Sequence, residues 1–237
     1  MFGQKFFGHH YSGLYIAVDG IGCCGKSTQV KEIEKRIREE YPDVQLLVTK
    51  EPGGTEKCDQ IRTAIVSKCE EKLLPWTEVL LFAASRGQAI GTLIEPALER
   101  GEAVLSDRSF LSSLCYQGFG YELGWQNVLA ANMHALNGIS PNLIIFPDVS
   151  QEVAAERLKI RSGRDNVYDS KIMNPEFFNR VRAGYKFFAK RCPQFIYEID
   201  GSLPAETQRE LIWERVALMI EENIETRREM IIRGERE

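Results

Sequence analysis

The chain has 237 residues, enough for one ordinary domain with a sizeable core, and its hydrophobic fraction of 43% and charged fraction of 27% are typical of globular proteins. Its net charge of −4 argues against a general nucleic-acid-binding protein, and no apolar run approaches the roughly 20 residues that a membrane-spanning helix needs. Six cysteines without C-x-x-C spacing and only three histidines argue against a zinc site and favour reduced thiols in the cytoplasm.

The first 13 residues show no periodicity and include the pair His9-His10. Paired histidines can bind a metal, but surface histidines in a terminal segment are the simpler interpretation. We therefore expect residues 1–13 to form a flexible N-terminal arm and residues 14–220 to form the folded domain. The charged residues 221–237 are expected to form a solvated tail.

The central motif is the stretch 20–28, which reads G-I-G-C-C-G-K-S-T and matches the phosphate-loop pattern G-x-x-x-x-G-K-[ST]. The apolar run 14–18 before it predicts a buried strand, and Val30, Ile33 and Ile37 after it predict a helix. A chance match is the alternative, but the order of strand, glycine-rich turn and helix favours a nucleoside triphosphate site.

Small residues in such a loop let successive backbone N–H groups point at phosphate oxygens, next to the positive end of the helix dipole. Lys26 would reach the β and γ phosphates of ATP, and the hydroxyl of Ser27 would coordinate Mg²⁺. The predicted ATP-binding residues are Gly20, Ile21, Gly22, Cys23, Cys24, Gly25, Lys26, Ser27 and Thr28.

Strands and helices alternate after this motif. The predicted strands are 44–48, 103–107, 142–146 and 195–199, and the predicted helices are 75–99 with an interruption at Pro96, 109–117, 125–137, 151–161, 175–191 and 205–225. This order predicts an α/β fold, a P-loop three-layer sandwich in which helices cover both faces of a five-stranded parallel sheet. Ligands of such sheets bind beyond the carboxyl ends of the strands. The segments that converge there are the phosphate loop, Glu51-Pro52-Gly53-Gly54, Asp107-Arg108 and the residues after Pro147-Asp148.

Two polar patterns indicate where a second substrate would bind. Phe82 and Arg86 lie four apart on a predicted helix, which suits stacking on a base and holding a phosphate. The alternative is a core phenylalanine beside a surface arginine. Ser113, Tyr116 and Gln117 form, with Ser109, one helix face after Asp107-Arg108, and that face points either inward or into water.

A third pattern consists of Arg157, Arg161 and Arg164, which recur at helical spacing and lead into the polar segment 161–172. These side chains form either a solvated basic face or a lid. In the second interpretation the arginines close over the triphosphate and stabilise the charge of the moving phosphoryl group.

Together these motifs resemble the thymidylate kinase family, in the same order over about residues 14–215. Besides the phosphate loop, the resemblance is carried by T-K-E-P-G-G-T at 49–55, E-V-L-L-F-A-A-S-R at 78–86, the segment 107–118 and F-F-N-R-V-R-A-G-Y at 177–185. The resemblance implies a homodimeric kinase that transfers the γ-phosphoryl group of ATP to dTMP, giving dTDP, with Mg²⁺ as cofactor.

The resemblance also implies roles for individual residues. Phe82 would stack on thymine, Arg86 and Arg108 would hold the acceptor phosphate, and Ser113 and Gln117 would lie near the base edge. Tyr116 would sit under the sugar and crowd a 2′-hydroxyl. Asp107 would order Mg²⁺, partly through water, and Glu51, followed by Pro52, would lie near that metal. The catalytic set would be Lys26, Asp107, Arg108, Arg161 and Arg164.

The chain departs from the family pattern at several of these positions. Gly22 stands where an acidic residue is usual. The absence of that acidic side chain removes a charged hydrogen bond worth about 1.5–3 kcal/mol. Other departures are Lys50 in place of an arginine, Ser109 in place of an aromatic residue, Leu111 in place of an acid and Asn166 in place of a lid arginine. Two alternatives therefore stay open, namely a kinase for another deoxynucleoside monophosphate and a non-catalytic nucleotide-binding protein.

Overall fold

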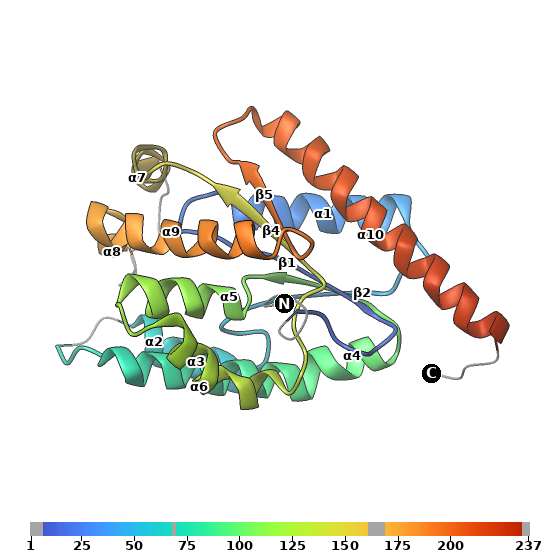
Figure 1. Ribbon diagram of the computed structural model, residues 1–237, viewed down its shortest axis with the longest axis horizontal. Coiled ribbons are helices and arrows are strands. Elements are labelled where there is room, and N and C mark those ends of the chain that lie inside the picture. Colours follow the sequence, from blue (N-terminus) through green and yellow to red (C-terminus); the bar gives the residue numbers. More distant parts are fainter. Residues whose placement is uncertain (1–6, 68–69, 161–168, 234–237) are drawn as a thin grey trace.

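The computed structural model describes residues 7–67, 70–160 and 169–233. Within these residues, five strands form one parallel sheet in the order β2-β3-β1-β4-β5 (Figure 1). The strands are β1 (Leu14–Val18), β2 (Leu46–Lys50), β3 (Ala103–Asp107), β4 (Leu143–Asp148) and β5 (Ile196–Asp200). The predicted α/β fold with a parallel sheet is confirmed.

Helices cover both faces of the sheet (Figure 1). They are α1 (Lys26–Glu40), α2 (Glu56–Val66), α3 (Pro75–Ala89), α4 (Glu95–Glu99), α5 (Phe110–Ser113), α6 (Trp125–Leu136), α7 (Gln151–Ile160), α8 (Asp169–Ile172), α9 (Pro175–Arg191) and α10 (Ala205–Arg233). Two π-helical turns, η1 (Ile90–Ile94) and η2 (Leu114–Gly120), continue α3 and α5. The expected interruption at Pro96 is therefore the π-helical turn η1 before it. A wider turn relieves the clash of a proline ring with the preceding turn of helix.

Two hydrophobic clusters lie on opposite faces of the sheet because alternate strand residues point to opposite sides. Tyr15 and Phe146 pack toward α3, α6, η2 and α9, whereas Ile16 and Leu105 pack toward α1 and α10. Helix α9 lies on the face of the sheet that carries Tyr15 and Phe146. Asn174 caps its start, and Tyr185 lies on its buried side.

The strand register brings the candidate site residues to one edge of the sheet. Val18 of β1 and Lys50 of β2 both pair with Asp107 of β3, so these three strands end at the same level. The next residues, Asp19, Glu51 and Arg108, therefore enter the same region. This edge is where the sequence predicted the ligand.

The N-terminal segment is held against the body from Phe7 onward. The Phe7 ring stacks on Phe195 with centroids 5.0 Å apart, Gly8 N donates to Pro141 O at 3.2 Å, and Tyr11 donates to Glu95 at 2.5 Å. Residues 7–13 of the expected N-terminal arm therefore contact the body of the domain through backbone hydrogen bonds and aromatic side chains.

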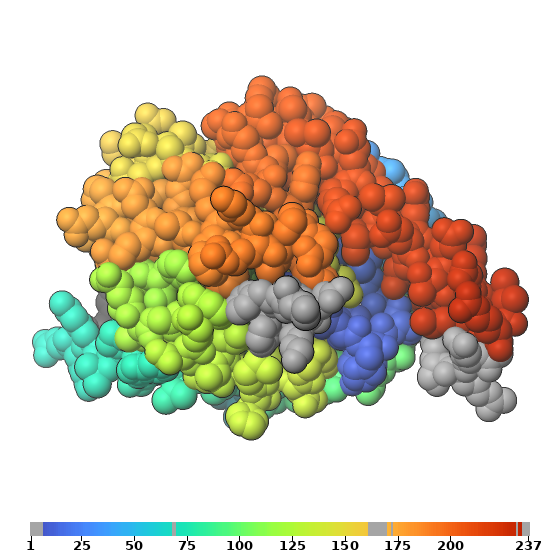
Figure 2. Space-filling model, in the orientation of Figure 1, coloured from blue at the N-terminus to red at the C-terminus, as the bar shows by residue number. Residues whose placement is uncertain are grey.

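The last helix is longer than the predicted 205–225. It continues to Arg233, and Asn223 and Arg227 donate to the backbone carbonyls of Ser12 and Gly101. Figure 2 shows this red helix beside the blue N-terminal part of the chain. No helix in the described part of the chain is long and apolar enough to cross a membrane.

Candidate functional site

The phosphate loop connects β1 to α1, and the side chain of Lys26 hydrogen-bonds back to the backbone of the loop. Gly25 adopts φ +102° directly before α1, a conformation that favours glycine, and allows the sharp turn into the helix. The Lys26 side chain is buried, and its ammonium donates to the carbonyl of Ile21 at 2.7 Å. The ammonium is therefore held inside the turn, where phosphate oxygens would be cradled.

Ser27 and Asp107 meet where the start of α1 faces the end of β3. The Ser27 hydroxyl donates to Asp107 Oδ2 at 2.7 Å. Hydroxyl and carboxylate oxygens are ligands that Mg²⁺ accepts, and this ion typically takes few protein ligands besides substrate phosphates and water. The described residues contain no cluster of three His, Cys, Asp or Glu side chains that could hold a metal by themselves. The Ser27–Asp107 pair therefore fits a phosphate-bound Mg²⁺.

Asp19 joins the phosphate loop to the start of α5. Its carboxylate is completely buried and accepts hydrogen bonds from Gly20 N, from the N–H and hydroxyl of Ser109, from those of Ser112, and from Tyr185. These donors compensate the cost of burying the carboxylate. Sequence reasoning missed Asp19, although a single acid between an apolar strand and the phosphate loop was a detectable signal.

Arg108 and Tyr116 link this centre to the predicted acceptor residues. Arg108 has φ +80° and donates to the carbonyl of Gly20 at 3.0 Å and to Ser112 at 2.9 Å. Its guanidinium lies over the Tyr116 ring, 5.5 Å from the centroid. The Tyr116 hydroxyl in turn accepts from Gly22 N at 2.9 Å. Tyr116 therefore contacts both the phosphate loop and one of the two predicted acceptor arginines.

Arg86 is the centre of a buried network. Its Nε donates to Glu51 at 2.7 Å, one terminal nitrogen donates to Asn132, and the other donates to Ser113 at 3.3 Å. Burial raises the pKa of the Glu51 carboxyl, and the charge of Arg86 opposes that rise. A guanidinium carries five N–H donors, so these three contacts leave two for a ligand. Pro52, beside Glu51, is also buried.

A second polar group lies about two helical turns before Arg86 on α3. The buried Glu78 accepts from Gln117 at 2.7 Å and from Tyr121 at 3.0 Å, and Lys171 of α8 lies 3.4 Å from the same carboxylate. The half-buried Phe82 lies between Glu78 and Arg86 along α3. The structure thus joins Arg86 of α3 to Ser113 of α5, and Glu78 of α3 to Gln117 of η2.

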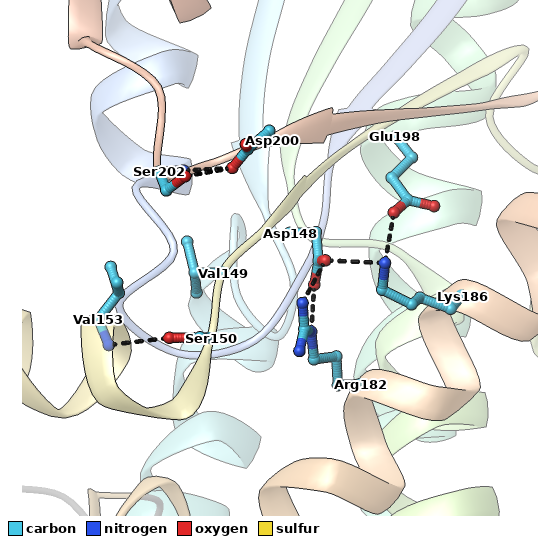
Figure 3. Close-up of a pocket in the computed structure, with 9 residues that line it drawn as sticks. All are labelled: Asp148, Val149, Ser150, Val153, Arg182, Lys186, Glu198, Asp200 and Ser202. Carbon is cyan, nitrogen blue, oxygen red and sulfur yellow. Dashed lines mark hydrogen bonds and ion pairs between the residues drawn. The ribbon is translucent and has the colours of Figure 1, made fainter.

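A pocket of about 580 Å³ opens beyond the carboxyl ends of β4 and β5 (Figure 3). Arg182 makes two hydrogen bonds to the buried Asp148, at 2.6 and 2.7 Å, and Lys186 bridges Asp148 and Glu198 at 3.0 and 2.9 Å. Other walls come from Ser150 before α7 and Val153 within it, and from Asp200 at the end of β5 and Ser202 after it. The predicted ligand region after Pro147-Asp148 is therefore hollow.

The family of the chain follows from comparison with known proteins. The thymidylate kinase family model matches residues 18–212. The chain belongs to the thymidylate kinase family. It is 38% identical over 199 residues to the thymidylate kinase of Kosmotoga olearia, an alignment that covers 84% of this chain and 93% of the relative. Its identity to the thymidylate kinase of Bacillus pumilus is 33% over 214 residues, covering 90% and 97%.

The fold is also similar to that of a solved thymidylate kinase. The crystal structure of the enzyme from Ehrlichia chaffeensis superposes with a TM-score of 0.65 at 26% sequence identity, covering 79% of this chain and 92% of the other. The family resemblance expected from the motifs is therefore confirmed.

The predicted lid of this thymidylate kinase family member is only partly described. Arg161 and Arg164 lie outside the described residues. Arg157 of α7 is described, and it donates to the carbonyl of Gly201 at 2.9 Å, next to the pocket beyond β4 and β5. Its contact ties α7 to the turn after β5.

Sequence reasoning also missed Glu78 and Asn132, which orient two of the predicted acceptor side chains. In the sequence, Glu78 is the first residue of the segment 78–86, and Asn132 lies in a largely apolar helix. Both are buried polar residues. Their isolation in apolar surroundings was the one available signal, since their partners are 39 and 46 residues away in sequence.

Proposed function

We propose that this protein transfers the γ-phosphoryl group of ATP to dTMP, giving dTDP. Membership of the thymidylate kinase family supports this function. The structural observation that carries it is the contact of Tyr116 with Gly22, since it joins the predicted acceptor face to the phosphate loop. Both substrates would therefore bind at one edge of the sheet, close enough for direct transfer.

Catalysis in this proposal consists of positioning and charge neutralisation. Lys26 holds the transferring phosphates of ATP, and Arg86 and Arg108 hold the phosphate of dTMP. Because the attacking phosphate oxygen is already a nucleophile, no strong general base is needed. Arg161 and Arg164 of the lid would neutralise charge as the bond to the leaving group breaks.

The chemistry of Ser27 and Asp107 suits Mg²⁺ as the cofactor. When bound, this ion would neutralise phosphate charge. The Ser27 hydroxyl would be a direct ligand, and the Asp107 carboxylate would act partly through water. The 2.7 Å contact between them supports this assignment, since it places both oxygens side by side next to the phosphate loop.

The proposed acceptor site would favour a deoxynucleotide that carries thymine. Phe82 would stack on the base, Ser113 and Gln117 would face its edge, and Glu51 with Pro52 would close the site near the phosphates. The ring of Tyr116 would occupy the space that a 2′-hydroxyl requires. Its position is fixed by the hydrogen bond from Gly22 and by Arg108.

We also propose that the protein is a homodimer, formed through an apolar stripe on α3 and α6. These helices pack side by side, and an added Cβ on Gly87 would lie 3.5 Å from Ala135. Trp76 and Leu80 of α3 and Met133 of α6 are exposed by 42%, 59% and 42%. Large apolar side chains gathered on adjacent helices favour association with a second copy.

A cytoplasmic location completes the proposal. Cys24, Cys58, Cys115 and Cys192 are unbridged thiols. Burial raises the pKa of Cys115 well above its usual value, so this thiol is a small apolar group in the core. Reduced, buried thiols are typical of proteins that work in a reducing compartment.

The test of the function is the formation of ADP and dTDP from ATP and dTMP, with the Lys26→Ala variant as the inactive control. Transfer to dTMP that Lys26→Ala abolishes would support the proposal. ATP binding without transfer to any monophosphate would instead indicate a nucleotide-binding protein without activity. Faster transfer to another monophosphate would indicate the alternative kinase.

A further inference from the structure

The Gln117 carboxamide is held in one orientation by Glu78. Its Nε2 donates to Glu78 Oε1 at 2.7 Å, and a carboxylate oxygen that faces an amide can only accept. Gln117 is 1% exposed, and its Oε1 atom has no hydrogen-bond partner within the described residues. A buried acceptor of this kind is costly unless a ligand donates to it.

The other oxygen of Glu78 is fixed as well. Tyr121 donates to Oε2 at 3.0 Å, and the Lys171 ammonium lies 3.4 Å from the same atom. An ammonium has no acceptor atom, so this side of residue 78 must present an oxygen. Both carboxylate oxygens of Glu78 therefore face hydrogen-bond donors.

Gln117 lies beside the residues that would hold the acceptor base. It follows Ser113 by one helical turn, and Ser113 accepts from Arg86. Glu78, Phe82 and Arg86 follow one another at intervals of four residues on α3. The contacts Glu78–Gln117 and Arg86–Ser113 thus flank Phe82, the predicted stacking partner of the base.

We propose that Glu78 is a positioning residue that selects the base, because it turns the Gln117 Oε1 acceptor toward the pyrimidine edge. Thymine carries an N–H donor at N3, whereas cytosine carries an acceptor there. The Oε1 atom of Gln117, held by Glu78, therefore accepts a hydrogen bond from N3–H of thymine, whereas it faces the N3 lone pair of cytosine and is repelled by it. This inference rests on the proposed function, since it assumes that dTMP binds between α3 and η2.

A single substitution should reverse this polarity. In Glu78→Gln, the new amide keeps its oxygen toward Lys171 and so turns its NH₂ group toward Gln117. The Gln117 side chain must then rotate, place Oε1 on residue 78 and present its own NH₂ group to the base. That arrangement opposes the N3–H of thymine and suits the N3 acceptor of cytosine.

The experiment compares kcat/KM for dTMP and dCMP in the wild type and in Glu78→Gln. We expect the dTMP/dCMP ratio to fall by about tenfold or more, mainly through opposite changes in the two KM values. In the double variant E78Q/Q117E, the amide at 78 donates to the carboxylate at 117, which again presents an oxygen to the base. The ratio should return toward the wild-type value.

The matched control is Tyr121→Phe, which removes the hydrogen bonds of the Tyr121 hydroxyl with Glu78 and Lys171 but keeps the contacts of Glu78 with Lys171 and Gln117. Its ratio should equal that of the wild type. An equal loss for both substrates in Glu78→Gln, or no recovery in the double variant, would overturn the inference and assign Glu78 a merely structural role. A wild type that prefers another monophosphate would overturn the proposed function instead, and the two failures are therefore distinguishable.

Discussion

Arg86 and Glu51 form a buried ion pair of 2.7 Å in which the side chains are only 2% and 6% exposed. The pair joins α3 to the loop after β2, and Tyr15 lies 3.4 Å from the same carboxylate. Removing one partner of such a pair leaves an uncompensated charge in the interior. The site thus depends on this contact for its folding as well as for its chemistry.

Arg86→Ala should destabilise the protein by about 3–5 kcal/mol, because Glu51 remains buried without its cation. The pKa of Glu51 should rise further, since Arg86 is the main group that opposes the effect of burial. Urea unfolding measures the first effect. The control Arg38→Ala breaks an exposed contact with Glu34 and should cost about 0–1 kcal/mol. Kinetically, the KM for dTMP should increase, and an unchanged KM would refute the acceptor role of Arg86.

Two substitutions at Tyr116 separate its ring from its hydroxyl. Tyr116→Ala should increase the use of the ribonucleotide analogue relative to dTMP, because the ring no longer occupies the 2′ position. Tyr116→Phe keeps the ring and should preserve discrimination. It should cost about 0.5–1.5 kcal/mol of stability, since Gly22 N loses its acceptor. Relative kcat/KM values for the two nucleotides decide the matter, and unchanged discrimination in Tyr116→Ala would exclude the gating role.

His9 should make the docked N-terminal segment sensitive to acid. Burial lowers its pKa from 6.5 to about 4, against a smaller opposing effect of Asn142. A folded-state pKa below the unfolded value means that the stabilising contribution is complete above pH 6.5 and is lost as the pH falls toward 4. The free energy of unfolding, measured across this range, should decline less steeply in His9→Asn. A titration of His9 by NMR near pH 6.5 would contradict this account.

The proposed dimer is tested by one charge on the apolar stripe. Leu80→Glu should convert the dimer to monomer, because a carboxylate would be buried at the interface. Leu218→Glu is the matched control, since Leu218 is 43% exposed but lies on α10. Sedimentation velocity or light scattering reports the mass of each variant. A wild type that is already monomeric, or a dimer that tolerates Leu80→Glu, would show that this stripe is not the interface.

The elements that bury a strong apolar pattern were predicted well from the sequence. The strands 14–18 and 103–107 and the helix 175–191 have the predicted bounds. The second strand lies at 46–50 instead of 44–48, because pairing of Leu46 with Ala103 and of Lys50 with Asp107 sets its ends. Hydrophobic runs mark the buried part of a strand, whereas its limits depend on the neighbouring strand.

Helix α2 was not predicted, since its sequence gives a weak signal. Only Cys58 and Ile65 of its 11 residues are buried, so its apolar face is narrow. Thr55 caps its start by accepting from Cys58 N at 3.3 Å. A cap of this kind fixes where a helix begins, but it is common outside helices too.

Much of the candidate site could be predicted because its residues lie in continuous sequence motifs. The buried polar residues that hold these side chains in place were missed, because their contacts join segments that are far apart in the sequence. The phosphate loop can be read within nine residues of sequence. By contrast, Asp19 and Tyr185 are 166 positions apart, and the packing of α9 on the sheet brings them together. Buried polar residues in apolar segments are therefore the feature to examine when a site is predicted from one sequence.

The most direct test of the account is a competition for phosphate. Equal concentrations of dTMP, dUMP, dCMP, dGMP and AMP are incubated with ATP, Mg²⁺ and the protein, and the diphosphates are separated by chromatography at early times. Initial product ratios equal the ratios of kcat/KM, independently of the amount of active protein. We predict that dTDP is the main product. A larger yield of any other diphosphate would contradict the assignment of dTMP as the substrate.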